Sequence, residues 1–222
     1  MDDNNKNWEL LEALCAELPT APEDYYNRLR VSPEASALYD WLLQSNRSYI
    51  IELPPDRHLS GTNADQQFLI ASDPIEKKLK FDELRMCYGS KLYFHGSRLE
   101  NYTGILRKGL VIASGTALEA NAAVHGKGIY ISPQLGFAIS YSNDARTSHA
   151  VVAICEVINS PDHVKQHTAD ILTVIDPDYA SIRMLLIYNP GPADGNRYGV
   201  RRKTTATYDT INTPEIRLQL GF

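Results

Sequence analysis

The stretch that decides the fold is KLYFHGSRLENYTGILRKGL, residues 91–110, followed after a loop of small residues by HGKGIYISPQLGFAISYS, residues 125–142. A β-type run ends at His95-Gly96-Ser97. The helical pattern that follows ends at Gly109, and glycine commonly ends helices because it tolerates the left-handed backbone conformation. The sequence therefore predicts a strand, a helix over about residues 99–108 and then a second strand.

Glycine stands at the end of the first predicted strand and just before the second. Gly96 follows His95, and Gly126-Lys127-Gly128 leads into Ile129-Tyr130-Ile131. Because glycine has no Cβ, another molecule can approach the backbone closely at such places. Two of them, each beside a polar or aromatic side chain, indicate one ligand held from two sides, as in a nucleotide site.

This stretch resembles the catalytic core of the poly(ADP-ribose) polymerase family, the diphtheria-toxin-like ADP-ribosyltransferases. Four pieces carry the resemblance in the family's order and spacing: His95-Gly96-Ser97, residues 101–110, residues 126–130 and residues 138–141. Residues 45–51 resemble the mono-ADP-ribosylating branch. The resemblance implies an α+β fold, the split β-sandwich of the ADP-ribosyltransferases, with NAD as co-substrate and no metal.

The resemblance also implies a role for each matching residue in binding NAD. His95 is expected to hydrogen-bond the adenine-ribose hydroxyl, and Gly96 to pair its backbone N–H and C=O with the nicotinamide amide. Tyr130 and Tyr141 are expected to sandwich the nicotinamide ring. Ser97 is expected to support the ribose side of the ligand.

Two positions depart from the family's pattern. The family uses a serine in the second helix to bond the nicotinamide amide, and that place falls on Ala138, so one contact is expected to be missing. The third triad member is Glu in polymerising members, and that place falls on Ile171, which gives the triad His95, Tyr130 and Ile171. Asp170 cannot substitute, because neighbours in a strand point to opposite faces. Isoleucine cannot orient a second ADP-ribose, which implies transfer of a single unit.

The expected function is therefore a mono-ADP-ribosyltransferase that moves one ADP-ribose from NAD to a protein acceptor, its own chain included, and releases nicotinamide. Carboxylate side chains are the first expectation for the acceptor, because they are ionised near neutral pH and attack without a base. Ser, Cys and Arg acceptors stay open. The alternatives are the same fold acting on nucleic-acid ends or a small molecule, and a catalytically weak NAD- or ADP-ribose-binding module.

Composition narrows the class of protein further. The 222 residues predict one domain, or one domain with a helical appendage, and the net charge of −5 gives no electrostatic reason to expect nucleic acid. The three cysteines form no CxxC pair, so a zinc site is not expected. No apolar run approaches the ~18 residues that a membrane span needs. The polar, acidic start is unlike a secretory signal, so we expect an intracellular protein, cytoplasmic or nuclear.

Outside the central stretch, the hydrophobic patterns predict helices first and a mixed two-sheet core afterwards. Residues 1–90 are interpreted as a helical N-terminal region packed on the core, and residues 91–222 as the ADP-ribosyltransferase catalytic domain. Helices are predicted at residues 8–18, 22–31, 32–45 and 74–87, and strands at 49–53, 67–71, 149–158, 169–175, 182–188 and, at an edge, 216–220.

Overall fold

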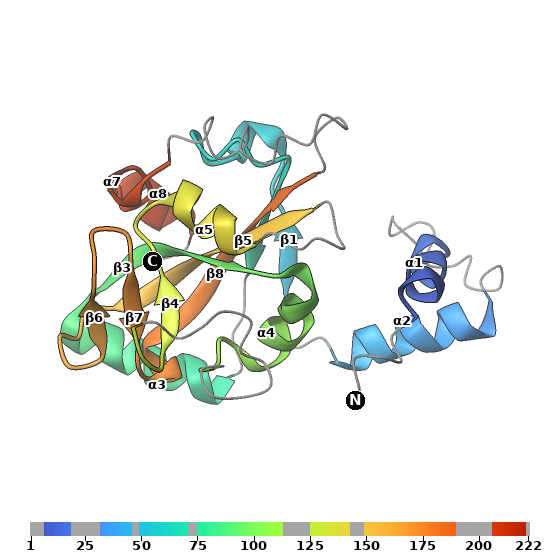
Figure 1. Ribbon diagram of the computed structural model, residues 1–222, viewed down its shortest axis with the longest axis horizontal. Helices are drawn as coiled ribbons and strands as arrows, with labels where there is room; N and C mark the ends of the chain where they lie inside the picture. The colour runs from blue at the N-terminus through green and yellow to red at the C-terminus, as the bar shows by residue number, and fades with distance from the viewer. Residues whose placement is uncertain are drawn as a thin grey trace. The chain divides into compact units, whose positions relative to one another are not determined.

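The computed structural model describes residues 7–18, 32–45, 49–70, 75–112, 125–142, 149–189 and 206–220. It combines helices with antiparallel sheets, so the predicted α+β class is confirmed (Figure 1). The elements of the central stretch are β3 (Ser90–Ser97), α4 (Tyr102–Lys108), β4 (Ile129–Ile131) and α5 (Leu135–Tyr141). The others are α1 (Trp8–Ala16), α2 (Pro33–Ser45), β1 (Ile50–Glu52), η3 (Pro55–Arg57), β2 (Gln66–Ile70), α3 (Ile75–Tyr88), η4 (Leu99–Asn101), β5 (Ala150–Ile158), β6 (Val164–Gln166), β7 (Leu172–Val174), η5 (Pro177–Tyr179), β8 (Ala180–Tyr188), α7 (Tyr208–Ile211) and α8 (Pro214–Gln219).

The chain divides into two units, Met1–Asn46 and Arg47–Phe222, whereas the sequence suggested a boundary near residue 90. The difference arises because β1 and β2 belong to the large sheet: β1 pairs with β2, and β2 pairs with β8. Residues 49–70 therefore contribute strands to the unit that carries the candidate site. That the N-terminal helices pack on this unit stays a prediction.

The described part of the first unit contains two helices with polar caps. The Asn7 side-chain oxygen accepts a hydrogen bond from the Leu10 N–H at 2.9 Å, at the start of α1. The Ser32 hydroxyl accepts one from the Ala35 N–H at 3.2 Å, at the start of α2. Such caps satisfy backbone donors that the first turn of a helix leaves unpaired. The helices predicted at 8–18 and 32–45 are confirmed, and the one predicted at 22–31 lies outside the described residues.

Within the described part of the second unit, the strands form two sheets. The larger has the order β1-β2-β8-β5-β3, and the smaller has the order β4-β7-β6. Successive residues of a strand face opposite sides, so Val151, Ala153 and Cys155 of β5 enter one core cluster and Val152 and Ile154 another. The first cluster includes residues of the small sheet, α3 and α4, and the second includes residues of α5 and α7. These helices accordingly lie on opposite sides of the large sheet in Figure 1.

The C-terminal segment corrects one prediction. Residues 216–220 were expected to form an edge strand, but Pro214–Gln219 is the helix α8, and the Thr213 side chain caps it. The alternation of apolar and polar residues suggested a strand, but it does not reveal the long-range contact that Arg217 makes from the helix. Its guanidinium donates to the Ser90 hydroxyl at 3.1 Å and lies 3.9 Å from the buried carboxylate of Glu156.

Glu156 is a fully buried carboxylate that joins several elements around the start of β3. It accepts hydrogen bonds from the Arg183 guanidinium at 2.8 Å and from the Ser90 hydroxyl. Arg85 of α3 lies 3.7 Å from the same carboxylate. A buried charge with these partners fixes relative positions, because removing one partner leaves the other charge uncompensated. The network therefore holds the strand that carries His95 and Gly96 against its neighbours.

Candidate active site

His95 sits on β3, at the edge of the large sheet, and meets the small sheet. Its Nδ1 lies 2.8 Å from the carbonyl oxygen of Tyr130 on β4. A carbonyl only accepts, so Nδ1 carries the hydrogen, and the neutral ring keeps a lone pair on Nε2. Burial lowers the pKa of His95 below its usual value, although the bond to Tyr130 opposes this shift. His95 therefore presents a hydrogen-bond acceptor to a ligand hydroxyl at neutral pH.

The lowered pKa of His95 predicts how pH affects stability. The unfolded chain binds this proton near pH 6.5, whereas the folded protein binds it only at lower pH. The free energy of unfolding should therefore be independent of this group above about pH 6.5 and fall as the pH drops below that value. Chemical denaturation of wild type and His95→Gln between pH 5 and 8 measures this. Equal pH dependence in both proteins would contradict the prediction.

Gly96 presents its backbone to the open edge of β3. The neighbouring bridge fixes the direction: the Phe94 N–H donates to the Ser132 carbonyl at 2.9 Å, and the Ser132 N–H donates back at 2.8 Å. The N–H and C=O of one strand residue point to the same side, and this side repeats every second residue. The N–H and C=O of Gly96 therefore point away from β5, toward the same edge as those of Phe94. A backbone pair of this kind matches a planar carboxamide.

Glycine is needed at position 96 because α5 approaches it closely. A Cβ at this position would lie 1.8 Å from the carbonyl oxygen of Ala138. Ala138 itself is buried in α5. The two positions expected to contact the nicotinamide amide, 96 and 138, therefore lie close together in the structure.

Gly96→Ala should therefore displace α5 and destabilise the protein by about 1–3 kcal/mol, as overpacking against backbone does. The matched control is Gly104→Ala in α4, where an added Cβ meets nothing within 4 Å. That substitution should stabilise the protein by about 0.5–1 kcal/mol, because alanine favours a helix more than glycine does. Denaturant midpoints measure both changes. A Gly96→Ala protein as stable as Gly104→Ala would contradict the close contact.

Tyr130 is half-buried on β4, and its side chain is held by the turn that precedes the strand. Its hydroxyl donates to the Gly126 carbonyl at 2.9 Å and accepts from the His125 N–H at 3.0 Å. Tyr141, at the end of α5, is 37% exposed, and its ring lies 5.3 Å from that of Phe137. Both rings predicted to stack on nicotinamide thus belong to elements that adjoin β3, and the sandwich itself stays a prediction.

Ser97 ends β3, and Asn101 holds its side chain: the Asn101 Nδ2 donates to the Ser97 hydroxyl at 3.0 Å. The Ser97 oxygen is thereby placed beside the start of α4, next in sequence to the His95-Gly96 edge. The predicted ribose-side role of Ser97 is untested by this contact.

Ile171 does not lie on the large sheet. It precedes β7, where its carbonyl accepts from the His167 N–H at 2.9 Å and from the Thr168 N–H at 3.3 Å. The strand predicted over residues 169–175 is therefore shorter, Leu172–Val174, because a turn occupies its first part. This turn belongs to the hairpin of β6 and β7, beside β4. The place of Ile171 as third triad member stays a prediction.

The two residues that lie directly across the large sheet from His95, on β5 and β8, are apolar. His95 pairs across β5 with Ala153, and Ala153 pairs across β8 with Leu185. Directly paired residues point to the same face. Neither of these cross-strand neighbours of His95 supplies a carboxylate.

Sequence reasoning missed Tyr102, which positions His95. Its buried hydroxyl donates to the carbonyl oxygens of His95 at 3.3 Å and of Val151 at 3.1 Å. Burial raises the pKa of Tyr102 well above its usual value, so the hydroxyl keeps its proton. The sequence signal for this positioning role is an aromatic residue in the first helical turn after His95-Gly96-Ser97.

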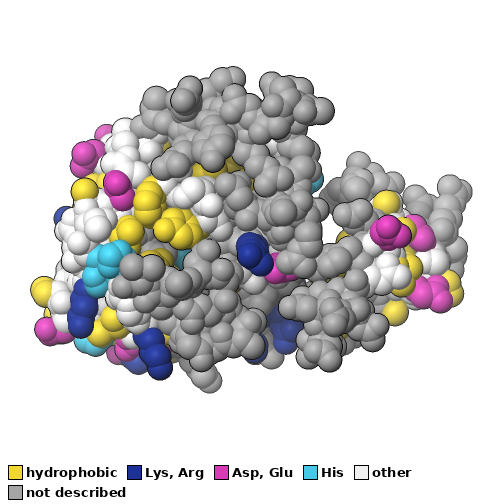
Figure 2. Space-filling view, in the orientation of Figure 1, with side chains coloured by type: hydrophobic (Ala, Val, Ile, Leu, Met, Phe, Trp, Pro, Cys, Tyr) yellow, Lys and Arg dark blue, Asp and Glu magenta, His cyan; other side chains and the backbone are white. Residues whose placement is uncertain are grey.

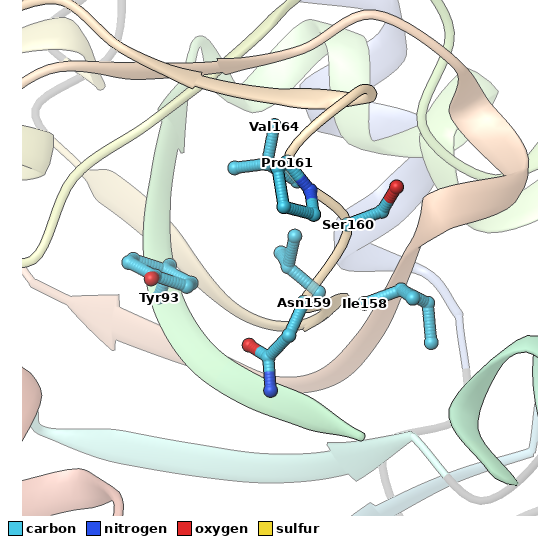
Figure 3. Close-up of a pocket in the computed structure, with 7 residues that line it drawn as sticks. Tyr93, Ile158, Asn159, Ser160, Pro161 and Val164 are labelled. Carbon is cyan, nitrogen blue, oxygen red and sulfur yellow. The ribbon is translucent and has the colours of Figure 1, made fainter. Parts of the chain in front are cut away.

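The pocket shown in Figure 3 lies away from these residues. Tyr93, Val164 and residues 157–161 line it, toward the opposite end of β5, and no predicted NAD-site residue is among them. Among the described residues, no group of three or more His, Cys, Asp or Glu side chains is arranged to hold a metal ion. Nor does any helix in the described ranges have the length and apolar character to cross a membrane.

Two packed sheets with His-Gly at the edge of one and Tyr130 on the other have the architecture of an ADP-ribosyltransferase. The sequence model of the family described as "Poly(ADP-ribose) polymerase catalytic domain" matches residues 64–184. The chain belongs to this family.

Two similar relatives are "Protein mono-ADP-ribosyltransferase PARP8" of Mus musculus and of Homo sapiens. Each is 33% identical over 193 residues, which cover 72% of this chain and 22% of the relative. The chain thus spans about a fifth of the length of these relatives.

Proposed function

We propose that this chain is a protein mono-ADP-ribosyltransferase that uses NAD as its co-substrate, modifies one protein acceptor side chain at a time and releases nicotinamide. The observation that carries the proposal is the outward-facing N–H and C=O of Gly96, next to the His95–Tyr130 contact. Membership of the family and the mono-ADP-ribosyltransferase name of the relatives support it. The acceptor is a protein, and the chain itself is one candidate.

In the proposed site, the nicotinamide carboxamide pairs with the backbone of Gly96. Tyr130 and Tyr141 stack on the ring, which contributes about 1 kcal/mol beyond burial. The Nε2 lone pair of His95 accepts a hydrogen bond from the adenine-ribose hydroxyl, and Ser97 supports the ribose side. These contacts hold the dinucleotide so that the bond between nicotinamide and ribose is exposed to the acceptor.

The reaction breaks the bond between the nicotinamide nitrogen and the ribose carbon. The electron pair of that bond goes to nicotinamide, which leaves neutral, and the ribose carbon acquires oxocarbenium character as in glycoside hydrolysis. Little proton transfer to the leaving group is therefore needed. The main task of the protein is to position the two reactants, since orientation alone lowers the barrier substantially.

Benzamide, which mimics nicotinamide, should bind this site weakly because Ala138 has no hydroxyl to offer. Ala138→Ser should tighten benzamide binding by about 0.5–1.5 kcal/mol, the contribution of one hydrogen bond. Calorimetric titration of both proteins measures this. Unchanged or weaker binding by a stably folded Ala138→Ser protein would place position 138 away from the amide.

Incubation with NAD labelled in the adenine part tests the proposed function, followed by gel analysis and mass spectrometry of the modified protein. Labelled protein together with released nicotinamide is the expected result. Binding of NAD without release of nicotinamide would favour a binding module. Label on added oligonucleotide but not on protein would favour a nucleic-acid acceptor.

A further inference from the structure

Two histidines that the family resemblance does not use lie together beside Tyr130. The rings of His125 and His167 are stacked, with centroids 4.8 Å apart and planes 19° from parallel. His125 precedes Gly126, and His167 lies in the turn between β6 and β7. The Nε2 of His167 lies 2.8 Å from the hydroxyl oxygen of Thr173, which is buried. This bond fixes the plane of the His167 ring, and the stacking in turn positions His125.

The pair is tied to the candidate site by direct contacts. The His125 backbone N–H donates to the Tyr130 hydroxyl at 3.0 Å. Thr173 is the cross-strand partner of Tyr130, so the two side chains leave the same face of the small sheet. Figure 2 shows His and Lys or Arg side chains near each other over β6 and β7. The backbone of His125 therefore contacts the hydroxyl of the ring proposed to stack on nicotinamide, and its imidazole lies against His167 in the adjoining hairpin.

A protonated acceptor needs a base, and Ala153 and Leu185, which lie across the sheet from His95, supply none. In the proposed function, Nε2 of His95 already accepts a hydrogen bond from the adenine-ribose hydroxyl. Among the described residues, none bonds to a ring nitrogen of His125. In its neutral form the imidazole of His125 has a lone pair that can accept a proton from an acceptor side chain.

We propose that His125 is the general base of the transfer, that His167 positions it, and that the acceptor is a hydroxyl or thiol side chain. This inference rests on the proposed function and names the substrate class of the same site. Imidazole is the commonest general base in proteins. A carboxylate acceptor, which the sequence alone favoured, would not require His125.

The step balances without a further reactant. The acceptor O–H or S–H transfers its proton to a ring nitrogen of His125 while the oxygen or sulfur forms a bond to the ribose carbon of NAD. The bond from that carbon to nicotinamide breaks, and its electron pair stays on the nicotinamide nitrogen. The imidazolium then releases its proton to water.

The test uses three synthetic peptides that differ only in one acceptor residue, Ser, Cys or Glu, with the full chain and NAD. For the Ser and Cys peptides, His125→Ala and His125→Phe should each lower kcat by about 10²–10⁴-fold, the usual contribution of a general base. His125→Phe keeps a ring to stack on His167. NAD binding measured by calorimetry should be unchanged in both variants.

The matched control is His163→Ala, which removes another imidazole stacked on an aromatic ring, that of Tyr179 at 3.9 Å. It should leave kcat unchanged.

Two results overturn the inference: wild type that modifies only the Glu peptide, or His125 variants that equal wild type with the Ser and Cys peptides. In each of these, transfer by wild type still supports the proposed function. Wild type that neither binds NAD nor modifies any peptide would instead refute the proposed function itself.

Discussion

His95→Ala is expected to abolish ADP-ribose transfer while the protein remains folded. The side chain donates one hydrogen bond to the Tyr130 carbonyl, so its loss should cost about 0.5–1.5 kcal/mol of stability. In the proposed site the larger effect falls on NAD binding, because Nε2 of His95 is the proposed acceptor for the adenine-ribose hydroxyl. Transfer is measured with labelled NAD, and folding by circular dichroism and the denaturant midpoint.

The chain offers a matched control in His58. This half-buried histidine also bonds a backbone carbonyl, since its Nε2 lies 3.0 Å from the Leu53 oxygen. His58→Ala should cost similar stability and retain transfer. Tyr130→Ala should also lose transfer, with an added stability cost of about 1–3 kcal/mol because the ring is half-buried. Wild-type transfer by His95→Ala would show that the family-derived role is wrong for this chain.

The central stretch could be predicted from sequence because each of its signals is local. Gly109 ends α4 with φ at +79°, as the pattern indicated. The strand that ends in His95-Gly96-Ser97 and the strand around Tyr130 are confirmed. The shared edge of Gly96 and Phe94 follows only from pairing with Ser132, which lies far away in sequence. The sequence pattern located these residues on their strands. The direction in which their backbone N–H and C=O groups point depends on pairing with residues far away in sequence.

Other features depend on contacts that no local pattern contains. Residues 216–220 alternate like a strand, yet Thr213 caps a helix there and Arg217 reaches Ser90. The stacking of His125 on His167 joins two turns separated by about forty positions of sequence, and the Tyr102 bond to His95 crosses from helix to strand. Ile171 was assigned to the third triad position by counting residues back along an expected strand. A turn occupies that part of the expected strand, so alternation along a strand does not apply at Ile171.

The second prediction with a large effect concerns the length of the product. The apolar neighbours of His95 on β5 and β8, together with isoleucine at the proposed third triad position, supply no carboxylate to orient a second ADP-ribose as nucleophile. The chain should therefore add one ADP-ribose per acceptor side chain and stop. The missing carboxylate should also make transfer slow. Electrostatic contacts of this kind typically stabilise a transition state by a few kcal/mol.

Ile171→Glu tests the proposed triad position. If this side chain reaches the nicotinamide ribose, the variant should transfer faster than wild type, whether or not it elongates the product. Asp170→Asn is the matched control in the same turn and should not change the rate. An Ile171→Glu protein that is folded and as slow as wild type would place the third triad position elsewhere.

The most direct test of the proposed activity is the intact mass of the modified protein after incubation with NAD, followed by mapping of the modified sites. We predict mass increments of single ADP-ribose units, each assigned to a separate side chain. A ladder of linked ADP-ribose units on one side chain would contradict the account.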